Sequence, residues 1–178
     1  MTKLVILDRD GVINADSPEY IKSASEWVAL PHSLEAIAKL RRAGFTVIVA
    51  SNQSGLGRGL FDADALASIH EKMRREVRHH GGDISAIYFC PHRPDEDCEC
   101  RKPRPGLLQQ IAKDRQITLK NVPVIGDSAR DLEAARAIGA RPILVLTGNG
   151  RKTLASGIPV DEVFEDLEQA ADALISES

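Results

Sequence analysis

The chain contains 178 residues, of which 43% are hydrophobic and 28% are charged, as is usual for a globular protein. This length suits one domain that buries enough apolar surface to fold without disulfide bonds, so we expect a single domain over residues 1–178. The formal net charge of −3 and the isoelectric point near 6.0 argue against nucleic acid as a partner, because nucleic-acid-binding proteins usually carry a basic excess.

No apolar run approaches the roughly 18 residues that a membrane-spanning helix needs. Met1 is followed almost at once by the first expected strand, without the apolar stretch or the small-residue cleavage site of a signal peptide. We therefore expect a cytoplasmic protein with no membrane partner. A monomer is the default expectation.

Short runs of aliphatic and β-branched residues alternate with helical patterns along the chain. Strands are predicted at Lys3–Asp8, Phe45–Ala50, Ile84–Phe89, Val122–Gly126 and Pro142–Leu146, with a late strand at Val160–Phe164. Helices are predicted at Ser33–Ala43, Ala63–Arg78, Gly106–Arg115, Ala129–Ile138 and Asp166–Ile175. The strands are mostly continuous apolar runs, which is typical of strands covered on both faces. This alternation indicates βαβ units and a mainly parallel sheet, so the fold class is α/β.

Two aspartates end the first predicted strand, in the sequence Asp8-Arg9-Asp10-Gly11. Residues i and i+2 of an extended chain face the same side, so Asp8 and Asp10 can point into one site at the carboxyl end of the strand. Two close carboxylates repel each other unless a cation lies between them, and oxygen ligands suit magnesium. Taken alone, the pattern could equally be an aspartate-rich turn.

Polar residues also follow two other predicted strands. The stretch Ser51–Gly55 brings hydroxyls and amides to the same edge of the sheet, a chemistry suited to phosphate oxygens. Asp127 follows the fourth strand, and Asp131 lies one helical turn later. Alone, Asp127 or Ser128 could be a helix N-cap, and Lys102 could be a solvated lysine.

One long irregular segment is expected, Cys90–Pro105, and it holds all three cysteines of the chain. Cys90, His92, Cys98 and Cys100 make a complete tetrahedral zinc set with no open position, which is typical of a structural zinc site. The alternative is three reduced cysteines without a metal. A disulfide within the Cys-x-Cys pair would be strained, and an iron–sulfur cluster prefers four cysteines.

In this order, the motifs resemble those of the haloacid dehalogenase superfamily of phosphotransferases. They are Asp-x-Asp-Gly at Asp8, a serine at Ser51, a lysine at Lys102 and Gly-Asp-Ser-x-x-Asp from Gly126. One departure is Val12, where the superfamily usually has threonine. The resemblance implies a Rossmann-like, three-layer α/β fold without a large cap domain.

The resemblance also implies catalytic roles. Asp8 would be the nucleophile that forms an aspartyl-phosphate. Asp10 would protonate the leaving oxygen and then deprotonate the attacking water. Ser51 would donate a hydrogen bond to the phosphoryl group, and Lys102 would supply a cation.

The same resemblance implies a magnesium cofactor in addition to the zinc ion. Magnesium would be held by Asp8, the backbone carbonyl of Asp10 and Asp127, with help from Ser128. The role of Asp131 stays open.

Within the superfamily, the branch with this zinc loop and the sequence Asp-Arg-Asp-Gly comprises heptose bisphosphate phosphatases and histidinol phosphate phosphatases. The stretch Ser51–Gly59 looks like the former, since the latter typically carry aspartate where this chain has Ser54. By resemblance, Arg101 would recognise the remote 1-phosphate of a small sugar bisphosphate, in nucleotide-heptose synthesis for surface polysaccharide such as lipopolysaccharide. The substrate-binding residues would be Asp8, Arg9, Asp10, Asp16, Ser17, Pro18, Glu19, Tyr20, Ser51, Asn52, Gln53, Ser54, Arg101, Lys102 and Ser128.

Two other classes of protein compete with a phosphatase. A receiver domain that is phosphorylated on aspartate also places acids, a hydroxyl and a lysine at the end of a parallel sheet. It normally takes the phosphate on a later strand and has no zinc loop, and Asp10 favours the enzyme. A non-catalytic zinc-binding interaction module leaves the aspartates and Lys102 unexplained.

Overall fold

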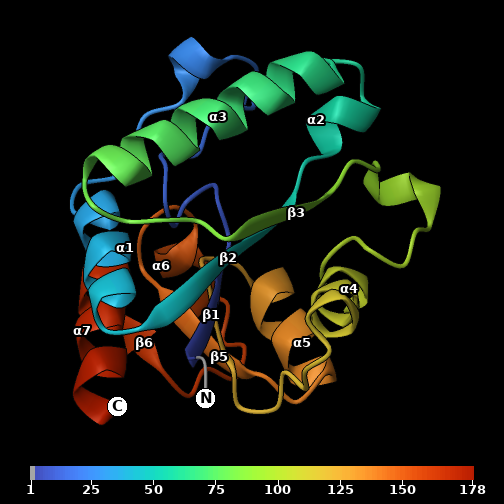
Figure 1. Cartoon of the computed structure of the whole chain (residues 1–178). Helices are drawn as coiled ribbons and strands as arrows, with labels where there is room; N and C mark the ends of the chain where they lie inside the picture. The colour runs from blue at the N-terminus through green and yellow to red at the C-terminus, as the bar shows by residue number, and fades with distance from the viewer. Residues whose placement is uncertain (1–2) are drawn as a thin grey trace.

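The structure is a computed structural model that describes residues 3–178 (Figure 1). Its sheet has six strands in the order β3-β2-β1-β4-β5-β6, and each neighbouring pair is parallel. The strands are β1 (Lys3–Leu7), β2 (Phe45–Asn52), β3 (Ala86–Cys90), β4 (Pro123–Gly126), β5 (Arg141–Val145) and β6 (Val163–Phe164). The helices are α1 (Ser33–Arg42), α2 (Ser54–Gly57), α3 (Ala63–His79), α4 (Gly106–Arg115), α5 (Ala129–Ala137), α6 (Gly150–Ala155) and α7 (Leu167–Glu177). Two 3-10 turns occupy Ala24–Glu26 and Pro94–Glu96.

Helices cover both faces of the sheet, which makes three layers (Figure 1). On one face, Val5 and Leu7 of β1 pack in a cluster with residues of α1, α3 and α7. On the other face, Ile6 packs in a second cluster with residues of α4 and α5. Successive residues of a strand point to opposite faces, so the apolar run of β1 serves both cores, as the sequence predicted.

Ile69, Met73 and Val77 of α3 belong to the first core, and Leu66 of the same stripe is also buried. The helix begins after Asp62, whose side chain accepts a hydrogen bond from the backbone N–H of Ala65 at 2.8 Å. Such a cap satisfies one of the backbone donors that the first turn of a helix leaves free.

The order of the strands in the sheet indicates where the candidate site lies. From β1 the chain runs outward through β2 and β3, and it then crosses over to β4 on the other side of β1. Ligands in open parallel sheets bind beyond the carboxyl ends of the strands, where the order changes direction. The carboxyl ends of β1 and β4 meet at this position, and Asp8 and Asp127 are the residues that follow them.

The structure corrects three sequence-based expectations. The longest irregular segment is residues 8–32 and not Cys90–Pro105. Its apolar residues are spaced without period, yet Ile13 and Trp27 are completely buried, so tertiary packing orders it. The late strand is only Val163–Phe164, and the short helices α2 and α6 were not expected.

The sequence predicted neither a large cap domain nor a membrane-spanning helix, and the structure can be compared with both expectations for residues 3–178. Within residues 3–178, no large cap domain is inserted between the strands. No helix in the same range combines the length and the hydropathy that crossing a membrane requires.

Candidate active site

A cavity of about 410 Å³ lies beyond the carboxyl ends of β1, β2 and β4. Its walls include twelve of the residues predicted to contact substrate, namely Asp8, Asp10, Asp16, Ser17, Pro18, Tyr20, Asn52, Gln53, Ser54, Arg101, Lys102 and Ser128. Segments that are far apart in the sequence therefore meet at the carboxyl ends of the strands, where the sequence predicted the site.

Lys102 is the buried cation of this cavity. Its Nζ atom lies 3.2 Å from Oδ1 of Asp8 and 2.5 Å from Oδ1 of Asp131, and it donates to the carbonyl of Ala50 at 2.8 Å. Burial alone would lower the pKa of Lys102, but the charges of Asp131 and Asp8 outweigh burial and raise it. Lys102 therefore stays charged beside Asp8.

Asn52 fixes the backbone of Lys102. Its Nδ2 donates to the carbonyl of Lys102 at 3.0 Å, and its Oδ1 accepts from the N–H of Lys102 at 3.0 Å. This pair of bonds ties the end of β2 to the segment that follows the cysteine loop. Asn52 thus has a positioning role in addition to its place in the cavity wall.

Asp8, Asp127 and Asp131 form a cluster of carboxylates, with oxygen atoms all within 4.8 Å of one another. Burial raises the pKa of Asp8 well above its ordinary value, and the neighbouring charge of Asp131 adds to the effect. Burial, followed by the charge of Asp131, raises the pKa of Asp127 to about 7. A divalent cation that prefers oxygen ligands would stabilise the ionised forms of these carboxylates, and the donor set fits such a cation.

Two glycines make room for the carboxylate of Asp127. A Cβ atom added to Gly11 or to Gly148 would lie 2.1 Å or 2.3 Å, respectively, from Oδ2 of Asp127. Both glycines have positive φ angles, of +83° and +55°. The backbone N–H of Asn149 donates to the same oxygen at 2.8 Å. Asp127 is therefore held at a fixed place in the cavity wall.

Asp10 is oriented by three side chains. The Nε and Nη2 atoms of Arg9 donate to its Oδ1 at 3.0 and 2.9 Å, and Nδ2 of Asn14 donates to the same atom at 2.9 Å. Nε2 of Gln53 donates to Oδ2 at 3.1 Å. Asp8 and Asp10 both line the cavity, as their i and i+2 spacing predicted.

Arg9 is completely buried beneath Asp10 and does not line the cavity. Its guanidinium is used by Asp10 and by Nε2 of His70 at 3.2 Å, so a contact of Arg9 with substrate through its backbone stays a prediction. Burial, together with the charge of Arg9, lowers the pKa of His70 to about 3. The imidazole is therefore neutral and can accept the hydrogen bond from Arg9.

Glu19 and Ser51 also lie outside the cavity wall. Glu19 is exposed to solvent, and its contact with substrate stays a prediction. Ser51 is buried, and its Oγ accepts a hydrogen bond from Nε2 of Gln53 at 2.7 Å. That contact leaves the hydroxyl proton of Ser51 free to donate, and its contact with a phosphoryl group stays a prediction.

Ser128 and Asp131 begin α5. The N–H and Oγ of Ser128 donate to Oδ2 of Asp131 at 3.1 and 2.9 Å, while the other oxygen of Asp131 contacts Lys102. The interpretation of Ser128 as a helix N-cap is confirmed. Asp131, whose role the sequence left open, connects this cap to the buried lysine.

The cysteine loop brings four potential ligands together. The donor atoms of Cys90, His92, Cys98 and Cys100 lie within 4.8 Å of one another. Sγ of Cys90 is 3.5 Å from Sγ of Cys98, much longer than the about 2.05 Å of a disulfide bond, and the cysteines are free. Burial opposes ionisation of Cys98, but hydrogen bonds from the backbone of Arg101 and from neighbouring thiols lower its pKa to about 7. Three thiols and one imidazole with no further protein ligand fit a structural zinc ion.

Sequence analysis missed several residues of the cavity wall. They are Ile21, Arg58, Pro94, Arg130 and Asn149. Arg58 lies in the stretch Ser51–Gly59, and Arg130 lies in the motif that begins at Gly126. Their positive charge within these motifs was the available sign of a place in the site. The direction of their side chains depends on how α2 and α5 pack, which no local pattern specifies.

Comparisons with known proteins agree with this geometry. A family model described as HAD-hydrolase-like matches residues 99–170. The chain is 54% identical to the D-glycero-β-D-manno-heptose-1,7-bisphosphate 7-phosphatase of Bordetella bronchiseptica, with 99% of both chains covered. It is 52% identical to the enzyme of the same name from Pseudomonas putida, with 97% of this chain and 99% of the relative covered.

The chain belongs to this family of heptose bisphosphate phosphatases. The crystal structure of the Bordetella bronchiseptica family member, complexed with magnesium and phosphate, superposes with a TM-score of 0.96 over 99% of both chains at 54% identity. The family member from Burkholderia thailandensis gives a TM-score of 0.78 at 47% identity, covering 98% of this chain and 99% of that one. The superfamily resemblance and the three-layer fold predicted from the sequence are thereby confirmed.

Proposed function

We propose that the protein is a magnesium-dependent phosphatase that hydrolyses D-glycero-β-D-manno-heptose 1,7-bisphosphate at the 7-position. The observation that carries the proposal is the arrangement of Asp8, with the ammonium of Lys102 at 3.2 Å and the carboxylate of Asp10 in the same cavity. The similarity to named relatives over 99% of the chain supports the choice of substrate.

The first chemical step forms an aspartyl-phosphate. A carboxylate oxygen of Asp8 attacks the 7-phosphorus, a new P–O bond forms, and the bond between phosphorus and the sugar oxygen breaks. The carboxyl group of Asp10 gives its proton to that sugar oxygen, so the sugar 1-phosphate leaves as a neutral alcohol at position 7. Lys102 offsets negative charge on the phosphoryl group, which is the main demand of phosphoryl transfer.

The second step restores the enzyme. The carboxylate of Asp10 takes a proton from a water molecule, whose oxygen attacks the phosphorus and displaces the carboxylate of Asp8. Inorganic phosphate leaves, and Asp10 is again protonated for the next cycle. The contacts of Arg9, Asn14 and Gln53 keep the carboxyl group of Asp10 in one orientation for both proton transfers.

Magnesium supplies the charge neutralisation that allows two anions, a carboxylate and a phosphate, to approach each other. Asp8, Asp127 and the backbone carbonyl of Asp10 are the proposed ligands, assisted by Ser128. Asp131 has a different role, because its two oxygens are used by Lys102 and Ser128. It positions the lysine.

A structural zinc ion on Cys90, His92, Cys98 and Cys100 completes the proposal. Cys100 is followed directly by Arg101 and Lys102. Fixing the loop would therefore fix both cations.

We further propose that the reaction serves nucleotide-heptose synthesis for surface polysaccharide, including lipopolysaccharide, in the cytoplasm.

The substrate assignment is tested by comparing kcat/KM for the heptose bisphosphate with kcat/KM for histidinol phosphate. We expect the heptose bisphosphate to be better by at least about tenfold, which corresponds to about 1.4 kcal/mol of transition-state binding. Asp8→Asn should abolish turnover and the acid-stable covalent phosphate label while the melting temperature stays within a few degrees. A higher kcat/KM for histidinol phosphate would overturn the substrate.

A further inference from the structure

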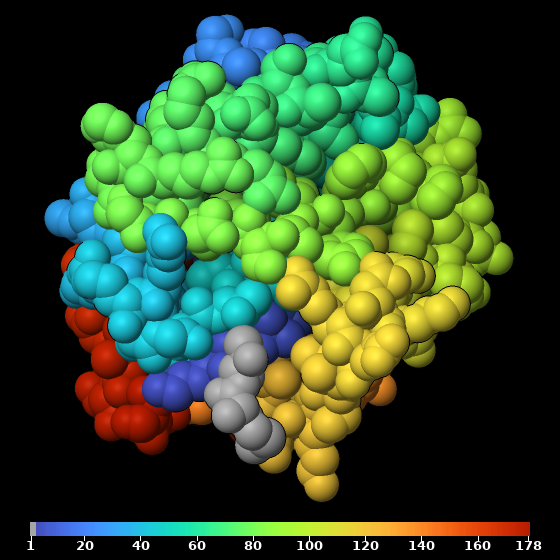
Figure 2. All heavy atoms as spheres, viewed as in Figure 1, coloured from blue at the N-terminus to red at the C-terminus, as the bar shows by residue number. Residues whose placement is uncertain are grey.

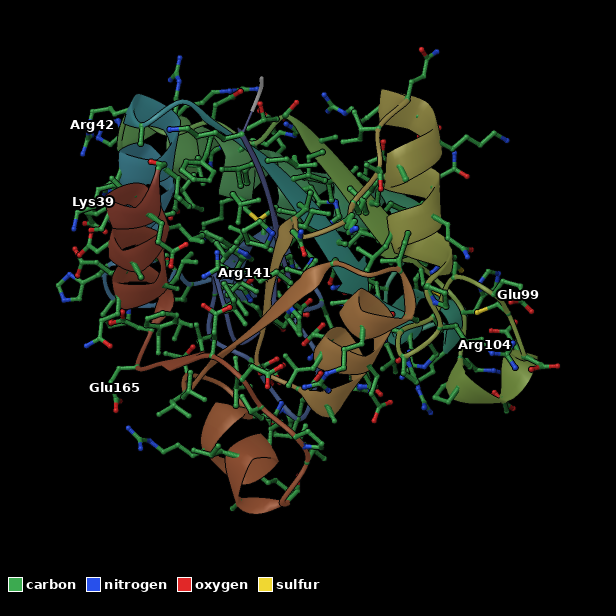
Figure 3. All side chains as sticks on the ribbon, turned by 90° about the horizontal axis from the view of Figure 1, so that it is seen from below. Lys39, Arg42, Glu99, Arg104, Arg141 and Glu165 are labelled. Atoms are coloured by element: carbon green, nitrogen blue, oxygen red, sulfur yellow. The ribbon has the colours of Figure 1, made fainter. Side chains whose placement is uncertain are left out.

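Arg9 is a buried arginine that lies directly against Asp10. Its side chain is completely buried, and its Nε and Nη2 atoms donate to Oδ1 of Asp10 at 3.0 and 2.9 Å. Ion-paired arginines at the surface differ: the side chain of Arg104 is 45% exposed, and Figure 3 shows Arg104 beside Glu99 at the outer end of the cysteine loop. Water screens exposed pairs of that kind, whereas a buried guanidinium acts more strongly on the carboxylate that it contacts.

The third nitrogen of this guanidinium contacts a histidine from a distant segment. Nη1 of Arg9 lies 3.2 Å from Nε2 of His70, which belongs to α3, 61 residues later in the chain. Among residues 3–178, this imidazole is the one hydrogen-bond partner of Nη1. Burial, and then the charge of Arg9, lowers the pKa of His70 to about 3, so the imidazole is neutral and Nε2 can accept. The contact therefore orients the guanidinium without adding a charge beside Asp10.

The imidazole of His70 is itself held in place by α3 and β3. Its ring lies 5.9 Å from the ring of Phe89 in β3, at an angle of 56° between the planes. His70 is buried, and Ile69 and Met73 on the same helix are buried in the first core. In Figure 2 the atoms of α3 and β3, both in shades of green, adjoin across the upper part of the molecule. The packing of α3 against the sheet thus sets the position of the imidazole.

The two carboxyl oxygens of Asp10 have different surroundings. Oδ1 accepts three hydrogen bonds of 3.0 Å or less, two from Arg9 and one from Nδ2 of Asn14. In the part of the chain that the structure describes, Oδ2 accepts one, from Nε2 of Gln53 at 3.1 Å. A proton on Oδ1 would have to displace one of its three donors, because an oxygen that carries a proton accepts fewer hydrogen bonds. The proton that Asp10 exchanges is therefore carried by Oδ2.

We propose that His70 is a positioning residue for the acid and base chemistry: it fixes Arg9, and Arg9 holds Oδ1 of Asp10 so that Oδ2 exchanges the proton. This inference rests on the proposed function, because it needs the two proton transfers of Asp10. His70 does not line the cavity and acts only through Arg9. A misplacement of about 1 Å that starts outside the site can cost about 10²-fold in rate, so the contact is of a size that can be measured.

The first test replaces His70 and measures kcat and KM for the heptose bisphosphate separately. We expect His70→Leu, which removes the acceptor, to lower kcat about tenfold without raising KM, because Asp10 acts in the transition state. His70→Gln offers an amide oxygen to Nη1 of Arg9 and should restore kcat to within about threefold of wild type. Val77→Ala, buried about two turns later in α3, is the control for lost packing and should keep the wild-type kcat. A wild-type kcat in His70→Leu, or an equal loss in the Leu and Gln variants, would overturn the role.

A second measurement separates the two chemical steps and does not use the sugar. p-Nitrophenyl phosphate is mixed with an excess of protein, and the release of nitrophenolate and of phosphate is followed within one turnover. Nitrophenolate leaves without a proton, so its release in His70→Leu should stay within about threefold of wild type. Phosphate release needs Asp10 as the base and should slow about tenfold. Equal slowing of both steps would mean that His70 supports the whole cavity and not Asp10, and it would overturn the inference.

A third measurement uses the unaltered protein, so it decides the question even where His70→Leu fails to fold. Nitrogen-15 NMR at pH 7 should show Nε2 of His70 without a proton, as an acceptor from Arg9 requires. A proton on Nε2 would overturn the inference. A wild type that hydrolyses p-nitrophenyl phosphate, with the slowing described for His70→Leu, but does not hydrolyse the heptose bisphosphate would support the role of His70 and overturn the proposed substrate.

Discussion

The Nζ atom of Lys102 lies 3.2 Å from Oδ1 of Asp8, and the lysine side chain is only 5% exposed. The same ammonium contacts Asp131 at 2.5 Å, so it is fixed between two carboxylates and cannot turn to solvent. A cation held in this way offsets charge on a phosphoryl group without rearrangement during the reaction, which is the most effective use of a charge in catalysis. Four consequences of this site and its supports can be measured.

Replacing the buried cation should slow the chemical step. We expect Lys102→Met to lower kcat by at least about 10²-fold, the usual effect of removing one preorganised donor from a charged transition state. Lys113→Met, on the exposed face of α4, is the matched control and should keep wild-type kcat. Circular dichroism and zinc content should be the same in both variants. A kcat within threefold of wild type for Lys102→Met would show that the ammonium has no catalytic role.

Magnesium affinity should depend on pH near neutrality. The pKa of Asp127 is raised to about 7 by burial and by Asp131, and only the ionised carboxylate can bind the cation. Below about pH 7 protons therefore compete with magnesium, and protonation of Asp127 alone should raise the Kd for magnesium by up to about tenfold for each pH unit. Protonation of Asp8, whose pKa is also raised, would make the rise steeper. Calorimetry at pH 8, 7 and 6, in buffers of different ionisation enthalpy, measures both the Kd and the protons released. A Kd that is constant over this range contradicts the role of Asp127.

His70 should make the protein less stable in acid. Its pKa is about 3 in the folded chain, against an ordinary value of 6.5, so between these values the unfolded chain binds more protons than the folded one. The stability that His70 contributes is complete above pH 6.5 and is lost as the pH falls toward 3, by up to about 1.4 kcal/mol per pH unit.

The variant His70→Gln keeps a hydrogen-bond acceptor for Arg9 and does not titrate. Asp8 and Asp127 have raised pKa values and act in the opposite direction, but they are common to both proteins. We therefore compare the free energies of unfolding in urea for wild type and His70→Gln from pH 7 to pH 4.5. The difference should shrink or reverse in favour of the variant as the pH falls. Parallel curves would mean that the pKa of His70 is the same in the folded and the unfolded chain.

Removing a ligand of the cysteine loop should affect activity more than global stability. In Cys100→Ser we expect the zinc content, measured as one ion per wild-type chain, to drop sharply and kcat/KM to fall by at least about tenfold. The loop lies outside the sheet, so the melting temperature should change much less. Asp95→Asn, in the same loop but 73% exposed and not a ligand, should retain zinc and activity. Full activity in metal-free wild type would contradict a structural role for zinc.

Much of the fold could be predicted because buried strands are recognisable in the sequence as continuous apolar runs. The apolar run before Asp8 and the one before Ser51 both end at the cavity, and the ends of parallel strands meet at one edge of a sheet. The Cys90–Cys100 ligand set was equally readable, since its spacing is local. The same reasoning indicated Asp127, which follows β4.

The sequence could not specify the directions of side chains that depend on packing between segments far apart in the chain. Arg9 lies between two cavity residues in the chain, yet its guanidinium points into the interior, where His70 of α3 accepts a hydrogen bond from it. Arg58 and Arg130 enter the cavity because α2 and α5 pack against it, and neither packing has a local signal. Residues 8–32 likewise have no periodic pattern, because burial of single residues such as Trp27 orders them.

The most direct test of the central claim follows the hydrolysis of heptose 1,7-bisphosphate by phosphorus NMR. The account predicts that magnesium and wild-type protein remove the 7-phosphate resonance, release one equivalent of inorganic phosphate and leave the 1-phosphate resonance intact. Asp8→Asn at the same concentration should leave both resonances unchanged. Loss of the 1-phosphate first, or hydrolysis that persists in Asp8→Asn, would contradict the account.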